Sequence, residues 1–146
     1  QAESYSAYTA KASNNTGDRF LGYWVNASGT NVGGIKYSST GSTYLTTSDL
    51  RLKTEIKSID SATNKLMAMN PVSHKWKADP EADAVHGFIA QEMMEIVPEA
   101  VSGDPEGEDM MSMDYGRITP VIVAALQEAN KKIMELENKI NELEGK

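Results

Sequence analysis

A hydroxyl and an amine lie five residues apart in this chain, on Ser48 and Lys53. A serine hydroxyl is a poor nucleophile near neutral pH unless a base removes its proton. A lysine amine can be that base when burial or nearby positive charge lowers its pKa toward neutrality. The two residues could therefore form a Ser-Lys dyad that cuts a peptide bond, although this pair of residue types at this spacing is also common by chance.

The bond to be cut is constrained by ring size. Attack by the Ser48 hydroxyl on the carbonyl of Thr47 passes through a five-membered ring and leaves an ester, whereas attack on its own carbonyl would need a strained four-membered ring. Chemistry alone therefore favours the Thr47–Ser48 bond. Cleavage of Ser48–Asp49 would need help from Asp49 or another group, so Thr47, Ser48 and Asp49 together define the candidate cleavage site.

The dyad also depends on local backbone shape. Along a fully extended segment, Ser48 and Lys53 would be roughly 16–18 Å apart. A turn between them, or a lysine from a neighbouring subunit, is therefore required. His86 is a possible third group that orients the dyad or shuttles a proton, with a hydrogen-bonded structural histidine as the alternative.

The composition of the chain changes at Ser48. Only five of the 14 basic and 21 acidic side chains lie in residues 1–47, which are rich in Gly, Ser, Thr, Asn and Tyr. Every Met and Pro lies after this point. We therefore expect three segments: residues 1–47, 48–116 and 117–146.

The bulk numbers exclude several classes of function. A net charge of −7 opposes nucleic acid as a partner and provides no polybasic patch for a membrane. The chain has no Cys, and its two acidic loops lack the spacing of a calcium loop, so no metal or cofactor is expected. No apolar run approaches the roughly 18–20 residues that span a bilayer. Because Gln1 is not an initiator residue, we expect a fragment of a longer protein.

Residues 1–47 alternate between short strand patterns and turn residues. They contain too few apolar side chains for a core of their own. Disorder is one outcome, but the aromatic and β-branched content favours strands intertwined with identical chains. Strands are predicted at Tyr5–Ala10, Phe20–Val25, Ile35–Tyr37 and Thr43–Thr47, and turns at 14–17, 27–30 and 32–34.

Residues 48–116 combine short strands and helices, which predicts an α+β unit. A strand is expected near 52–57, followed by a helix over Ala62–Met69 that Asp60 or Ser61 can cap. Further on, we expect a strand at Val72–Lys77, a buried strand at Gly87–Ala90, a helix at Gln91–Val97 and a short strand or helix lead-in at Met111–Tyr115.

From Thr119-Pro120 onward the chain predicts one long helix with a heptad pattern. In a parallel coiled coil, Lys132 and Lys139 at g would face Glu137 and Glu144 at e of the neighbouring chain. The alternative is a helix docked on its own domain. Ile at a with Leu at d favours two strands, which the N-terminal segment would have to override in a trimer. The a positions are Leu126, Ile133 and Ile140, and the d positions are Ile122, Ala129, Leu136 and Leu143.

Four ordered motifs resemble the peptidase S74 family, the C-terminal intramolecular chaperone domain of phage endosialidases, tail spikes and tail fibres. The resemblance covers roughly residues 48–143. The motifs are Ser48-Asp49 with Lys53 and Ile56, then Asn70-Pro71-Val72 leading to Trp76-Lys77, then Gly87-Phe88-Ile89-Ala90-Gln91-Glu92 with Pro98-Glu99, and Asp114-Tyr115 before the long helix.

The resemblance implies a homotrimer in which two identical chains join each chaperone domain. The assembly drives folding of a triple-stranded β stalk, of which residues 1–47 would be the end, and then releases itself by cleavage at Ser48. Stalk folding would bring Ser48 and Lys53 into register. Family members are generally cut after the Ser, whereas ring size favours the bond before it, so both bonds remain candidates.

The resemblance further implies a location in a virion tail spike or fibre, assembled in the bacterial host cytoplasm, with the chaperone part absent from the mature particle. A competing hypothesis is a non-cleaving trimeric fibre tip or adhesin that binds a host receptor. A cleaved transcription-factor module would need a basic DNA-binding segment upstream of these residues.

Overall fold

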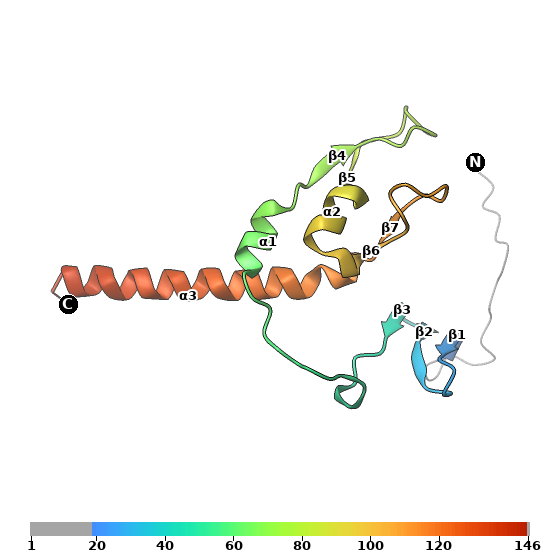
Figure 1. Cartoon of the computed structure of the whole chain (residues 1–146), viewed down its shortest axis with the longest axis horizontal. Coiled ribbons are helices and arrows are strands. Elements are labelled where there is room, and N and C mark those ends of the chain that lie inside the picture. Colours follow the sequence, from blue (N-terminus) through green and yellow to red (C-terminus); the bar gives the residue numbers. More distant parts are fainter. Residues whose placement is uncertain (1–18, 146) are drawn as a thin grey trace. The chain divides into compact units, whose positions relative to one another are not determined.

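The computed structural model describes residues 19–145 and divides the chain into two compact units, Gln1–Ile56 and Lys57–Lys146. In the described residues, the first unit has three strands and a single turn of 3₁₀ helix, and the second has short helices, short strands and one long helix (Figure 1). The second unit therefore has the α+β composition that the sequence predicts. The strand predicted at Tyr5–Ala10 and the turn at 14–17 lie outside the described residues.

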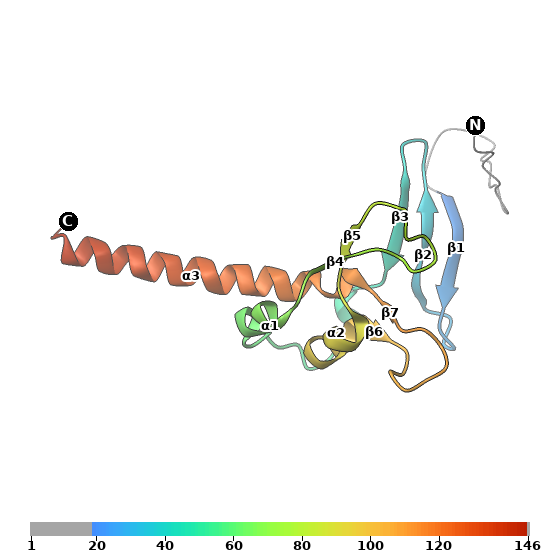
Figure 2. The same ribbon diagram turned by 90° about the horizontal axis from the view of Figure 1, so that it is seen from above.

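The first unit is an antiparallel sheet in the order β1-β2-β3 (Figure 2). The strands predicted at Phe20–Val25, Ile35–Tyr37 and Thr43–Thr47 and the turn predicted at 27–30 are confirmed. The Asn26 side chain holds that turn, because its Oδ1 accepts the backbone N–H groups of Ser28 at 3.1 Å and Thr30 at 2.9 Å. The strands are β1 (Arg19–Val25), β2 (Asn31–Tyr37) and β3 (Ser42–Thr46).

The turn predicted at 32–34 is wrong, because Gly33 and Gly34 lie inside β2. Both glycines allow close backbone approach. A Cβ on Gly33 would lie 2.5 Å from the carbonyl oxygen of Leu45, and one on Gly34 would lie 2.6 Å from that of Gly22. The glycines therefore serve strand packing rather than chain reversal.

The sheet buries almost none of its apolar side chains. Among the described residues of this unit only Gly33 and Gly34 are buried, and Tyr44 is 80% exposed. Large apolar side chains remain open to water at Phe20, Leu21, Tyr23, Trp24, Val25 and Val32 as well. The prediction that this segment lacks a core of its own agrees with this exposure.

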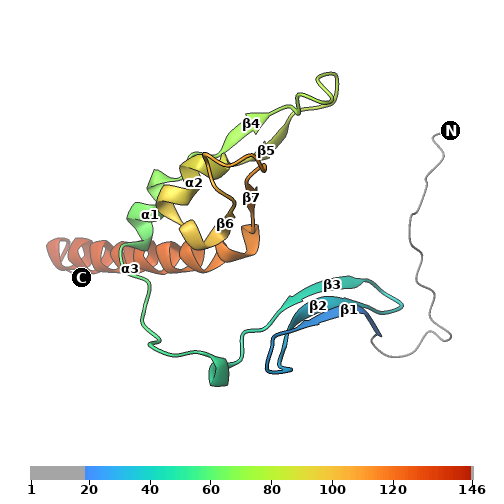
Figure 3. The same cartoon turned by 45° about the vertical axis from the view of Figure 1, so that its right-hand side comes forward.

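The second unit has a small core beside the first turns of its long helix (Figure 3). That core contains Met69, Met93, Val97, Ala100, Ile118 and Val121. Its elements are α1 (Ala62–Ala68), β4 (Val72–His74), β5 (Val85–Gly87), α2 (Ala90–Ile96), η2 (Pro98–Ala100), β6 (Val101–Ser102), β7 (Ser112–Met113), η3 (Tyr115–Arg117) and α3 (Thr119–Leu143).

The start of α1 is capped from a distance. Ser61 occupies the N-cap position, as one of the two predicted candidates, but its backbone is left-handed and its side chain makes no cap hydrogen bond. Instead Glu128 of α3 accepts the backbone N–H of Ala62 at 3.1 Å, and the backbone N–H and hydroxyl of Thr63 at 2.8 and 2.5 Å. This carboxylate satisfies the otherwise unpaired N–H groups of α1 and joins α1 to α3.

The Glu128 contacts predict an acid-sensitive step in stability. The Thr63 hydroxyl, followed by its backbone N–H, lowers the pKa of Glu128 from its ordinary 4.5. Because the folded pKa is lowered, this stabilisation is complete above the ordinary value and is lost as pH falls through the folded pKa. We expect Glu128→Gln to remove this part of the pH dependence, measured as the thermal midpoint of helical circular dichroism at neutral pH and below pH 4.5.

Glu142→Gln is the matched control, because Glu142 occupies the same heptad position of α3 two heptads later. It should leave the acid dependence unchanged. Parallel loss of stability with acid in wild type and Glu128→Gln would show that the carboxylate is not the cause.

Candidate functional site

The structure places the Ser48 hydroxyl and the Lys53 amine of one chain within hydrogen-bonding distance. Lys53 Nζ donates to Ser48 Oγ at 2.8 Å. The two residues flank a single turn of 3₁₀ helix, η1 (Leu50–Leu52), closed by Leu52 N–H to Asp49 C=O and Lys53 N–H to Leu50 C=O at 3.1 Å each. The strand predicted near 52–57 is therefore wrong: Leu52 ends the 3₁₀ turn, and residues 53–57 form no strand.

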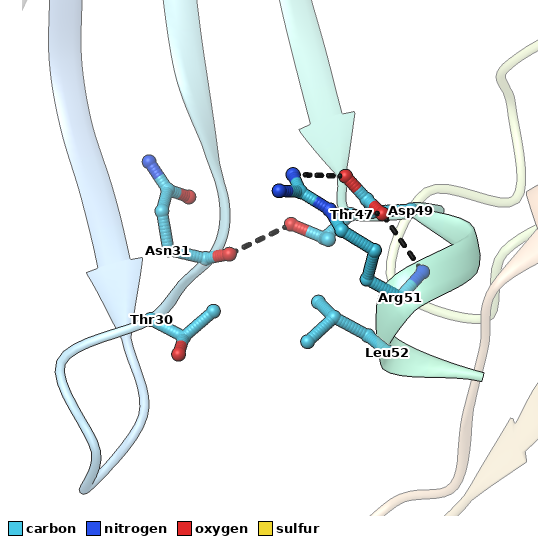
Figure 4. Close-up of a pocket in the computed structure, with 6 residues that line it drawn as sticks. All are labelled: Thr30, Asn31, Thr47, Asp49, Arg51 and Leu52. Atoms are coloured by element: carbon cyan, nitrogen blue, oxygen red, sulfur yellow. Dashed lines mark hydrogen bonds and ion pairs between the residues drawn. The ribbon is translucent and has the colours of Figure 1, made fainter. Parts of the chain in front are cut away.

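Asp49 begins this turn as its N-cap. Its Oδ1 accepts the backbone N–H of Arg51 at 2.9 Å and Arg51 Nε at 3.0 Å, and its Oδ2 accepts Arg51 Nη2 at 2.7 Å (Figure 4). The side-chain contact with Arg51, and then the backbone one, hold the pKa of the Asp49 carboxyl below its usual 3.8. Asp49 is thus an ionised cap across the neutral pH range.

Thr47 holds the chain on the N-terminal side of Ser48. Its backbone N–H donates to Val32 C=O at 3.2 Å, and its hydroxyl donates to Asn31 C=O at 2.9 Å (Figure 4). These bonds extend the sheet one residue beyond β3. The two candidate scissile bonds therefore lie between an anchored strand end and a capped helical turn.

A cavity of about 420 Å³ opens beside this junction, within the first unit. Arg51, Leu52 and Thr47 face Thr30 and Asn31 across it (Figure 4). Sequence reasoning missed Arg51 and Asn31. Arg51 could have been found, because an Asp followed two residues later by an Arg indicates a possible ion pair. Asn31 could not, because it contributes its backbone carbonyl, which its residue type does not indicate.

The dyad lies in water in the single chain. Ser48 and Lys53 are both exposed, and the neighbouring apolar side chains Leu50, Leu52 and Ile56 are 71%, 56% and 63% exposed. Lys53 is the donor of the hydrogen bond, whereas a general base has to accept the serine proton. The arrangement therefore supplies the contact for catalysis but not the dry surroundings in which lysine serves as a base.

His86 belongs to the second unit, where it lies on β5 opposite Ser73 of β4 and is exposed. Its role at the candidate cleavage site remains a prediction. His74 packs edge-on against Trp76 with ring centroids 5.1 Å apart, and its buried Nδ1 has no hydrogen-bond partner. This contact gives His74 a packing role.

Residues 19–145 contain no group of three or more acidic or histidine side chains arranged to hold a metal ion. Within the same range, no helix has the length and apolar character needed to cross a bilayer.

Comparison with known proteins places the junction at the start of a known module. Residues 48–102 match the peptidase S74 family model, described as the chaperone of endosialidase. The chain is 31% identical over 87 residues to the long tail fiber protein Gp37 of Escherichia phage AR1, which covers 56% of this chain and 8% of that protein. It is 35% identical over 100 residues to a probable tail fiber protein of Escherichia phage Phieco32, covering 65% of this chain and 14% of that one.

Gp37 of Enterobacteria phage T2 is 28% identical over 98 residues, with 64% of this chain and 7% of that protein covered. The chain thus spans only a small part of the length of these curated relatives. The matched region begins at Ser48 itself and continues through α1 and α2. Through residues 48–102, the chain is similar to the peptidase S74 family, the chaperone of endosialidase.

Proposed function

We propose that this chain is the C-terminal intramolecular chaperone of a phage tail fibre or tail spike, which trimerises, drives folding of the β stalk before it, and then cuts itself free at Ser48. The observation that carries the proposal is the 2.8 Å contact between Lys53 Nζ and Ser48 Oγ at the first residue of the family match. The tail fibre relatives support the setting in a virion tail.

In the proposed reaction, neutral Lys53 takes the proton of Ser48 Oγ while that oxygen attacks the carbonyl carbon of Thr47. The C–N bond between Thr47 and Ser48 breaks, and the amine of Ser48 receives the proton from Lys53. Thr47 is then held as an ester on Ser48 Oγ. Water hydrolyses this ester, which leaves a carboxylate on Thr47 and restores the Ser48 hydroxyl.

Assembly would act on this reaction by removing water. Leu50, Leu52 and Ile56 lie next to the dyad in the sequence and are exposed in one chain, so association with identical chains would bury them. The same contact would desolvate Lys53 and favour its neutral form. Cleavage would then follow assembly, and the released stalk could unfold only by a slow route.

The long helix offers a surface for that association. Val121 and Ala125 of α3 are buried against their own unit, and Glu128 caps α1. The heptad seam lies on another face. Its a and d residues Ile122, Leu126, Ala129, Ile133, Leu136, Ile140 and Leu143 are all exposed. A helix docked on its own domain through this seam would have buried them, so the exposure favours the parallel coil.

Substitution of the dyad should stop cleavage without preventing assembly. Wild type is expected to be cut, Ser48→Ala to stay intact, and Lys53→Ala to be slowed by about 10²–10⁴-fold, since a positioned base contributes that much to rate. Denaturing gels over time and intact mass spectrometry measure the outcome. Lys57→Ala is the control, because Lys57 is an exposed lysine of the same segment.

The mass of the released piece identifies the bond, because it begins with Ser48 or with Asp49. Hydroxylamine should accelerate cleavage only if an ester on Ser48 forms. Equal cleavage of wild type, Ser48→Ala and Lys53→Ala would overturn the dyad. An assembled wild-type chain that stays at 15.9 kDa would favour the permanent fibre tip that binds a receptor.

A charge in the heptad seam should break the trimer. Ile133→Lys places an ammonium at an a position, and Met134→Lys places one at the adjacent b position; the native side chains are 52% and 62% exposed in one chain. Burial of an Ile contributes roughly 1.5–3 kcal/mol per side chain, so Ile133→Lys should weaken association by more than 100-fold. Sedimentation equilibrium gives the mass of each assembly.

Met134→Lys should remain trimeric and be cut at the wild-type rate, whereas Ile133→Lys should be monomeric and cut slowly. Similar masses for the two variants would count against the seam. A wild-type mass of one or two chains would count against the trimer.

A further inference from the structure

Asp49 and Arg51 together hold the turn η1 through their hydrogen bonds. The Asp49 carboxylate holds both the backbone and the guanidinium of Arg51 through three hydrogen bonds of 2.7–3.0 Å. Two backbone bonds of 3.1 Å then close the turn, and the second of them is donated by Lys53 itself. The carboxylate therefore fixes Arg51 in the middle of the turn, and the turn fixes the backbone of Lys53.

Among the described residues of the first unit, packing does little to hold this turn. No residue of η1 is buried, and both Leu50 and Leu52 are exposed. A single 3₁₀ turn supplies few hydrogen bonds for the conformational entropy that it costs. An exposed ion pair alone adds little to stability, but here it coincides with an N-cap on the same residue.

We propose that Asp49 and Arg51 form a clip that positions Lys53 against Ser48, so that both are positioning residues of the self-cleavage reaction and neither is catalytic. This inference rests on the proposed function. Without the clip, the segment samples extended conformations in which the Lys53 amine lies far from Ser48. The clip keeps the dyad in contact before any neighbour covers it.

The bonding of Asp49 opposes a direct role in proton transfer. Each of its carboxylate oxygens already accepts at least one bond from Arg51, and Ser48 Oγ is bonded to Lys53. The lowered pKa of Asp49 makes it a poor base at neutral pH. Its chemistry suits a fixed, ionised cap.

Two substitutions at Asp49 separate positioning from catalysis. Asn caps helices about as well as Asp, whereas Ala does not, and Asn cannot accept a proton as a carboxylate does. We expect Asp49→Asn to be cut within about threefold of the wild-type rate and Asp49→Ala to be slowed roughly 3–30-fold. Arg51→Lys keeps the charge but lacks the planar fork, so it should be slower than wild type, with Lys57→Ala as the unaffected control.

A second readout does not depend on cleavage. In the full chain carrying Ser48→Ala, hydrogen exchange at the amides of Arg51 and Lys53 reports the cap and the turn. Both amides should lose protection on adding Asp49→Ala and keep it on adding Asp49→Asn. Equal slowing of cleavage by Asn and Ala, or unchanged exchange with Ala, would overturn the clip.

Failure of the proposed function is distinguishable from failure of the clip. If Ser48→Ala is still cut, the cleavage chemistry is wrong, and the exchange measurement still decides whether Asp49 holds the turn. If Ser48→Ala is intact but Asp49→Asn is as slow as Asp49→Ala, the dyad stands and the positioning role falls.

Discussion

The hydrogen bond between Lys53 and Ser48 depends on a change of backbone direction over five residues. An extended segment would separate the two residues by roughly 16–18 Å, whereas with η1 between them Lys53 Nζ and Ser48 Oγ lie 2.8 Å apart. Everything that the junction can do chemically follows from this one turn. The strand end anchored by Thr47 and the cap supplied by Asp49 limit how the turn can move relative to the sheet.

A second constraint is the shortage of buried surface in the single chain. The β1–β3 sheet leaves Trp24 and Tyr44 in water, and α3 leaves its whole heptad seam exposed. Exposed apolar surface of this extent on strands and helix alike is typical of chains that complete their fold with partners. The small core is the exception, and Met69, Met93, Val97 and Ala100 of that core lie within the family match.

The sequence predicted the elements whose signal is local and periodic. The strands near Phe20–Val25 and Thr43–Thr47, the helix before Pro71 and the long helix from Thr119 all followed from alternation, heptad spacing or proline. The need for a turn between Ser48 and Lys53 followed from chain length alone. Which chain supplies the lysine could not be predicted, because spacing does not distinguish a bend from a neighbour's side chain.

The misses have a common cause in contacts that are distant or carried by the backbone. Gly33 and Gly34 suggested a turn, but the close approach of Leu45 and Gly22 that they permit becomes visible only when the strands are paired. Ser61 had the right side chain for a cap, yet the carboxylate of Glu128, 66 residues beyond Ala62 on α3, accepts the N–H groups at the start of α1. In each case the residue type indicated a local structural feature, but not the distant residue that completes it.

On the proposed function, the contact between Lys53 and Ser48 that is already present in one chain changes which step would control cleavage. If the dyad formed only in the folded stalk, assembly would control geometry; here the geometry comes from residues 47–53 of a single chain. On the proposed function, control then falls on the surroundings of Lys53. A local turn forms far faster than an intertwined trimer, because its contacts span few residues. The chain would therefore have Ser48 and Lys53 in contact but exposed to water, and so inactive, throughout folding. Burial of Leu50, Leu52 and Ile56 would be the last event before the peptide bond at Ser48 breaks.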